Sequence, residues 1–259
     1  MARSDEASQR LVGLGVEPRS GSLDDLEILQ TAAQQADVVV HAAVDYFDPG
    51  FEAREAAALE ALLDGPGQLI YLSTTLVLAD TGPHPVSEEV SASQATVQPF
   101  KLAGEQRVLE AGGTVVRLGI VYGCNGSGLL TALLAAAKAQ GGSGYVGSGE
   151  ARWSAVHVDD VAELLARVVV SGDAAGLLVH AVEAEAVPWR AIAEAIARNA
   201  GVAAVSLPQE QAAAAGLGSM AEQLTKNLWV VPTRARDYFD WHPDGKGILH
   251  DLEYGSYRS

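Results

Sequence analysis

A few hydroxyl and amine side chains could bind and protonate a small organic substrate. Thr74 and Thr75 end the apolar segment "LIYLSTT", and Lys101 lies one turn inside the predicted helix "PFKLAGEQRVLE". Tyr46 follows another apolar segment, in "AVDYFDPG". Together a threonine hydroxyl, an ammonium group and a phenol could carry out general acid–base catalysis, with Tyr46 as the candidate proton donor.

Each of these side chains also has a structural alternative. Ligands bind at the carboxyl ends of strands in open α/β sheets, which favours a site at Thr74 and Thr75. The alternative for both threonines is hydrogen bonding at a strand end. For Lys101 it is a solvent-facing position on its helix.

Composition and charge exclude several classes of protein. The chain has 259 residues, of which 48% are hydrophobic and 19% charged, as is typical of a globular protein. A formal net charge of -16 argues against binding to nucleic acid or to an anionic membrane surface. One cysteine and a polar start without a signal peptide predict a cytoplasmic protein without an intrachain disulfide. No His, Cys and acidic residues have metal-ligand spacing.

Apolar runs without alternation predict strands that are buried on both faces. Such runs occur in "DVVVHAA", "QLIYLSTT", "TVVRLGIVYG" and "GLLVHAV", and helical segments separate them. A further short strand is expected in "VEPRSGSL". This order predicts an α/β fold, with a Rossmann-like parallel sheet in residues 1–185 and a smaller, mostly helical substrate lobe in residues 186–259.

Three segments in this order resemble the extended short-chain dehydrogenases, also called the NAD-dependent epimerase/dehydratase family. They are "LIYLSTTLVLAD", "FKLAGEQRVLEAGGTVVRLGIVYG" and "ARWSAVHVDDVAELLARVV". The segments "ADVVVHAA" and "DYFDWHPDGKGILHDLEYG" extend the match over nearly the whole chain. The resemblance implies a Rossmann-like fold and a cleft for a small-molecule substrate.

The sequence departs from the family's pattern at two points. The family binds a dinucleotide through a glycine-rich turn after its first strand, and no such turn lies near this N-terminus. By the family's register the first two strands are missing, and Ser22 stands where an acidic residue commonly contacts adenine. Thr74 and Lys101 match the family's catalytic Ser/Thr and Lys, but Val97 occupies the place of the catalytic tyrosine.

The resemblance also implies which residues line the substrate cleft. Tyr122 lies near the end of the third apolar run and Cys124 directly follows it, and Arg152 and Trp153 belong to a segment that lines the cleft in the family. The alternative for Trp153 is a place in the core. Cys124 has no identifiable base nearby, which argues against a nucleophile. For His41 and His157 a structural role is favoured.

The missing strands would leave one edge of the sheet exposed next to residues 37–43. Unpaired backbone groups on an apolar edge are costly. We expect that residues 16–19 repack against this edge and that the protein self-associates near it as a homodimer.

Together these features predict a cofactor-independent, non-redox enzyme on a dehydrogenase scaffold. It would catalyse an isomerisation, cyclisation or elimination, and an alanine-rich composition with more arginine than lysine indicates bacterial metabolism. One alternative is an NAD(P)-dependent epimerase, dehydratase or reductase whose front end is missing from this sequence. The other is a non-catalytic ligand-binding pseudoenzyme.

Overall fold

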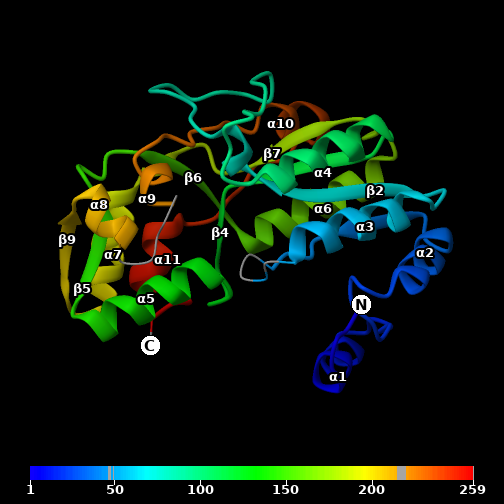
Figure 1. Ribbon diagram of the computed structural model, residues 1–259, viewed down its shortest axis with the longest axis horizontal. Coiled ribbons are helices and arrows are strands. Elements are labelled where there is room, and N and C mark those ends of the chain that lie inside the picture. Colours follow the sequence, from blue (N-terminus) through cyan, green and yellow to red (C-terminus); the bar gives the residue numbers. More distant parts are fainter. Residues whose placement is uncertain (46–47, 49, 215–219, 259) are drawn as a thin grey trace.

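A computed structural model describes residues 1–45, 48, 50–214 and 220–258 of the protein (Figure 1). Its main sheet has four parallel strands, in the order β1-β2-β3-β7. Their bounds are β1 Val38–His41, β2 Gln68–Thr74, β3 Thr114–Leu118 and β7 Leu178–Ala181. The parallel α/β fold that the apolar runs predict is therefore confirmed.

Helices cover both faces of this sheet, which is why its strands are apolar on both sides. On one face α2 (Leu26–Gln34), α3 (Phe51–Leu63) and α4 (Pro99–Glu110) pack against side chains such as Leu69 and Val115. On the other face α6 (Val158–Ser171) and α10 (Thr233–Phe239) pack against Ile70, Val116 and Val179. Figure 1 shows α3 and α4 running along β2.

A second group of elements lies at the other end of the molecule, around the C-terminus (Figure 1). It contains a three-stranded sheet, β4-β6-β8, and a two-stranded sheet, β5-β9. The helices α5 and α7 pack on these strands around a shared apolar core. The bounds are β4 Ile120–Tyr122, α5 Gly128–Gln140, β5 Gly142–Val146, β6 Arg152–His157, β8 Ala186–Pro188, α7 Trp189–Ala200, β9 Ala203–Leu207, α8 Gln209–Ala212, α9 Met220–Gln223 and α11 Ile248–Tyr254.

Chain segments from both sides of residue 185 build this second group. The strand β5 pairs with β9 over the whole length of both strands. The boundary at residue 185 stays a prediction.

The loop after β2 connects the two groups. It begins with a short 3-10 helix, η1 (Thr75–Leu78), and continues to α4. Val86 forms a parallel bridge with Val230, and the Gln223 amide donates to the Ala79 carbonyl. The Glu88 carboxylate accepts backbone N–H bonds from His180 on β7 and Arg234 on α10. The residues at the end of β2 are therefore fixed to both halves of the molecule.

The N-terminal segment forms helix α1 (Asp5–Gly13), and α1 has no buried residue. The expected strand in residues 16–23 is wrong: Ser20 alone forms a bridge, with Ala2. Residues 16–19 do not pair with β1, whose one strand partner in the described chain is β2. Val40 of β1 is 42% exposed, so the outer edge is open, and the homodimer that would cover it stays a prediction.

None of the described helices is both long and apolar enough to span a membrane.

Gly104 lets α4 cross β2 closely, and it provides a test of this packing. A Cβ at Gly104 would lie 2.5 Å from the Tyr71 hydroxyl oxygen. We expect Gly104→Ala to lower the free energy of unfolding by about 1–3 kcal/mol, because Tyr71 is fully buried and cannot move away. The measurement is denaturant unfolding.

The matched control is Gly13→Ala in α1, where nothing lies within 4 Å of the added methyl group. We expect no loss there and a gain of up to about 1 kcal/mol. An equal effect of the two substitutions would contradict the close crossing of α4 and β2.

Candidate functional site

Thr74 lies at the carboxyl end of β2 and caps the following 3-10 helix. Its Oγ1 accepts a hydrogen bond from the Leu76 backbone N–H, at 3.2 Å. No described residue accepts the Thr74 hydroxyl proton, so this proton can be donated to a bound ligand. Thr75 beside it is buried, with 3% of its surface exposed.

Lys101 is buried beneath the same strand end, with 2% of its surface exposed. Its ammonium group donates to the Glu55 carboxylate at 2.8 Å and to the Leu72 carbonyl at 3.2 Å. Lys101 therefore does not face solvent. The Leu72 carbonyl that it contacts lies two residues before Thr74 on β2. Val97, in the place of the family's tyrosine, is half-buried and has no proton to transfer.

Tyr46, the candidate proton donor, lies outside the described residues. The substitution of this phenol for the family's tyrosine stays a prediction.

Tyr122, at the end of β4, is buried in a cluster of acidic groups. Its hydroxyl donates a short hydrogen bond to Glu183 and accepts one from the Gly247 N–H. Asp160 accepts N–H bonds from Asp244 and Gly245 of the same loop. The cluster therefore fastens the loop before α11 to the ends of β4 and β7.

Burial perturbs the acidic groups of this cluster. It raises the pKa of Glu183 to about 7, and the neighbouring Asp160 charge adds to the effect. Burial also raises the pKa of Asp160 above its ordinary value. The His157 ring packs edge-on against the Tyr122 ring, with the two centroids 5.1 Å apart. Its Nδ1 accepts a hydrogen bond from the Asp159 backbone N–H at the start of α6. His157 thus has the structural contacts that the sequence favoured.

Cys124 is exposed in the glycine-containing turn between β4 and α5. The N–H groups of Gly123 and Ser127 both donate to the Tyr257 hydroxyl, and the Asn125 N–H donates to Ser256. Residues near the C-terminus thus occupy the donors that this turn would offer to an anion.

The side chains of Arg152 and Trp153 make contacts with different residues. The Arg152 guanidinium lies over the Trp229 ring, 5.4 Å from its centroid, and donates to the Ala186 carbonyl. Trp153 is buried, donates its indole N–H to the Lys226 carbonyl and packs edge-on against Trp189. Trp153 therefore contributes to the core of the second group of elements.

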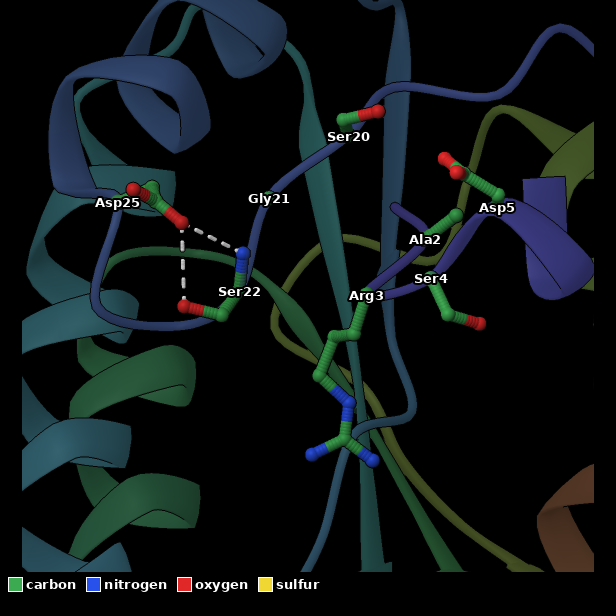
Figure 2. Close-up of a pocket in the computed structure, with 8 residues that line it drawn as sticks. All are labelled: Ala2, Arg3, Ser4, Asp5, Ser20, Gly21, Ser22 and Asp25. Atoms are coloured by element: carbon green, nitrogen blue, oxygen red, sulfur yellow. Dashed lines mark hydrogen bonds between the residues drawn. The ribbon is translucent and has the colours of Figure 1, made fainter.

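A pocket of about 340 Å³ lies at the start of α1 (Figure 2). Its lining combines a guanidinium group, several hydroxyl groups and two carboxylates: Ala2, Arg3, Ser4, Asp5, Ser20, Gly21, Ser22 and Asp25. Asp25 accepts bonds from the Ser22 N–H and hydroxyl, which shapes the turn (Figure 2). No described acidic residue forms an ion pair with Arg3.

Of the residues that line this pocket, only Ser22 was singled out from the sequence, by its place in the family's register. The signal it missed is the arginine of "ARSD", placed directly before a serine that caps a helix. Free N–H groups at a helix start and an adjacent guanidinium favour a bound anion. Glu55, the partner of Lys101, was also missed, because 46 residues separate the two in sequence.

The comparisons with known proteins connect this geometry to a family. The model described as "NAD dependent epimerase/dehydratase family" matches residues 2–178. The uncharacterized protein YLL056C of Saccharomyces cerevisiae is 30% identical over 97% of this chain and 88% of its own length. The 2'-dehydrokanamycin reductase of Streptomyces kanamyceticus is 31% identical over 62% of this chain and 50% of its own length.

Solved structures with the same fold include dinucleotide complexes. RMD from Pseudomonas aeruginosa, complexed with NADPH, superposes with a TM-score of 0.67 and 18% identity, over 93% of this chain and 87% of that one. The dTDP-glucose 4,6-dehydratase of Bacillus anthracis, in complex with NAD, gives 0.72 and 15% identity, over 93% and 79%.

These findings overturn the prediction that the chain uses no cofactor, because the matching family is NAD dependent and its fold is solved with NAD and NADPH bound. That prediction relied on the missing glycine-rich turn and on Val97 in the place of the catalytic tyrosine. The expected non-redox reaction depended on the same reasoning, and the relatives favour the NAD(P)-dependent alternative.

The acidic cluster around Tyr122 predicts how stability depends on pH. A pKa of about 7 for Glu183 means that the folded state binds this proton more tightly than the unfolded state does. The stabilisation is present at acidic pH and is lost as the pH rises from about 4.5 through 7. We expect Glu183→Gln to reduce this loss by about 1–2 kcal/mol, measured by urea unfolding between pH 5 and 8.

The control is Glu185→Gln, an exposed position two residues away. If both variants show the wild-type pH dependence, Glu183 is not the group that titrates.

Proposed function

We propose that this chain, which belongs to the NAD dependent epimerase/dehydratase family, is an NADP(H)-linked enzyme. Its reaction would interconvert a ketone and a secondary alcohol in a small organic molecule. The observation that carries this proposal is the pocket at the start of α1, whose residues suit the adenosine end of a phosphorylated dinucleotide.

The pocket offers the donors that a phosphate monoester requires. Arg3 supplies a guanidinium group and Ser4 a hydroxyl group, while the Ser22 hydroxyl already donates to Asp25. The first N–H groups of α1 add a partial positive charge. In dinucleotide-binding folds an arginine near the adenosine ribose accommodates the 2'-phosphate that distinguishes NADP from NAD.

The residues at the ends of β1 and β2 suit the nicotinamide end. Thr74 has a hydroxyl proton without a described acceptor, and Lys101 lies beneath the same strand end. The glycine-containing turn after β4 is a poor site for the pyrophosphate, because Ser256 and Tyr257 already accept the N–H bonds of Gly123, Asn125 and Ser127. The described residues therefore fit the two ends of the cofactor, and we assign none to its pyrophosphate.

A bound NADPH would supply the hydride. The chain's own contribution is to bind and orient. The Thr74 hydroxyl would donate to the substrate oxygen and hold the carbonyl carbon in one orientation. Val97 has no acidic proton to donate. The proton for that oxygen must therefore come from Thr74, from water or from a residue outside those described.

The names of two relatives support this substrate class. One is 2'-dehydrokanamycin reductase, and another is a ketoreductase that acts on a quinoline-1-oxide in Stigmatella aurantiaca. The reduction of a carbonyl group in an oxygenated organic molecule is the chemistry that these two names share.

The proposal predicts a charge-specific effect at Arg3. We expect Arg3→Ala to weaken NADPH binding by about ten- to a hundredfold, the loss expected for one charge-assisted bond to phosphate. Binding of NADH should change less than threefold, because NADH lacks the 2'-phosphate. The measurement is isothermal calorimetry with the purified 259-residue protein.

Arg10→Ala is the control, since Arg10 lies on α1 but does not line the pocket. Equal losses for NADPH and NADH in Arg3→Ala would remove the phosphate assignment. No binding of either dinucleotide to the wild-type protein would overturn the proposed function.

A further inference from the structure

Four buried polar side chains form a cluster under the carboxyl ends of β1 and β2. Glu55 of α3 is 2% exposed, Lys101 of α4 2%, Tyr71 of β2 0% and His41 of β1 4%. The cluster therefore joins the two helices on this face of the sheet to the two strands that they cover. Its contacts converge on one carboxylate oxygen of Glu55.

Glu55 Oε1 accepts the Lys101 ammonium at 2.8 Å and the Tyr71 hydroxyl at 2.7 Å. His41 Nε2 lies 3.7 Å from the same oxygen, too far for a hydrogen bond. The other oxygen, Glu55 Oε2, is buried and has no described hydrogen-bond partner. The same is true of His41 Nε2. Burial alone would raise the pKa of Glu55, but the contacts with His41, Lys101 and Tyr71 outweigh it and hold that pKa below its ordinary value.

A buried ion pair of this kind is poor evidence for a purely stabilising role. The desolvation of both charges is costly, and apolar residues of similar volume often serve stability equally well. The charge and direction of the Lys101 ammonium group are therefore the better guide to the role of this pair. Burial lowers the pKa of Lys101, and the Glu55 charge opposes that shift. Glu55 thus favours the charged form of a buried lysine.

The hydrogen bonds of Lys101 leave one donor unassigned. An ammonium group has three N–H bonds. Two of them are directed at Glu55 and at the Leu72 carbonyl. Both acceptors are fixed, one by the helix and one by the strand, so the direction of the third N–H is fixed as well.

We propose that Glu55 is a positioning residue of the cofactor site, which holds Lys101 as a charged donor beneath Thr74 in a chain that has Val97 in place of the family's tyrosine. This inference rests on the proposed function. In this arrangement Lys101 no longer has a tyrosine to activate, and Glu55 sets its charge and its direction instead.

Tyr71 does not replace the missing tyrosine. Its ring lies against the Lys101 ammonium, 4.5 Å from the centroid, so a tyrosine and this lysine do meet in space. However, the Tyr71 hydroxyl donates its proton to Glu55, so this proton is not offered to a substrate. Its contribution is to hold the Glu55 carboxylate.

The first experiment needs no cofactor. The chain has four lysines, so the titration of Lys101 can be followed in the free protein by NMR of ¹³C-labelled lysine side chains, assigned with Lys101→Met. We expect Glu55→Gln to lower the titration midpoint of Lys101 by at least one pH unit while the other three lysines keep theirs. An unchanged Lys101 midpoint would overturn the proposal.

The second experiment separates positioning from stability. In Glu55→Leu/Lys101→Met both charges are removed together, so neither is left buried and unpaired. We expect this variant to remain folded, with a melting temperature close to that of the wild type, and to bind NADPH at least tenfold more weakly. The single variant Glu55→Gln should weaken NADPH binding as well, and Glu55→Asp should restore part of it.

A second buried pair on the same helix provides the matched control. Arg117 of β3 binds Glu105 of α4 through two hydrogen bonds, and both side chains are buried. We expect Glu105→Leu/Arg117→Met to leave NADPH affinity within threefold of the wild type. Wild-type affinity in the Glu55/Lys101 double variant would show that the pair is structural only.

The two proposals fail in different ways. If the wild-type protein binds no dinucleotide, the proposed function is wrong, and the lysine titration still decides whether Glu55 controls Lys101. If the wild type binds NADPH and the double variant binds it equally well, the proposed function stands and the role of Glu55 is wrong.

Discussion

The buried ion pair of Glu55 and Lys101 is the interaction on which the arrangement of the candidate site depends. It joins α3 to α4, and through the Leu72 carbonyl it joins both helices to β2. Because two charges are buried together, neither helix can shift along the sheet without leaving a charge unpaired, which is far more costly than losing an exposed pair. The Leu72 carbonyl that Lys101 contacts lies two residues before Thr74 on β2, so the pair fixes both helices next to this strand end.

A second set of contacts ties the rest of the molecule to that strand end. The loop after β2 places Glu88 where its carboxylate accepts N–H bonds from β7 and from α10. On the far side, Tyr122 and Asp160 hold the loop before α11. Polar groups that are remote in sequence thus help to determine how the two groups of elements meet. Apolar contacts contribute as well, because Val77, Leu78 and Leu102 belong to the core of the second group.

This division explains what the sequence could predict. The strands β1, β2, β3 and β7 were predictable because each is a short apolar run covered on both faces, and covering helices follow from that pattern. The surroundings of Lys101 were not predictable, because its partner Glu55 is one of many acidic residues on surface-like helical segments. The pocket at α1 was missed for a related reason: Arg3 and Ser22 meet only because Ala2 pairs with Ser20. The prediction of no cofactor gave weight to the missing glycine-rich turn and to Val97, and none to these contacts.

A crystal structure of the protein with NADPH would test the account most directly. The account predicts that the 2'-phosphate lies against the Arg3 guanidinium and the start of α1, and that the nicotinamide ribose lies within hydrogen-bonding distance of Lys101, with the Glu55 contact retained. NADPH bound elsewhere, or a Lys101 that turns away from Glu55 when NADPH binds, would contradict it.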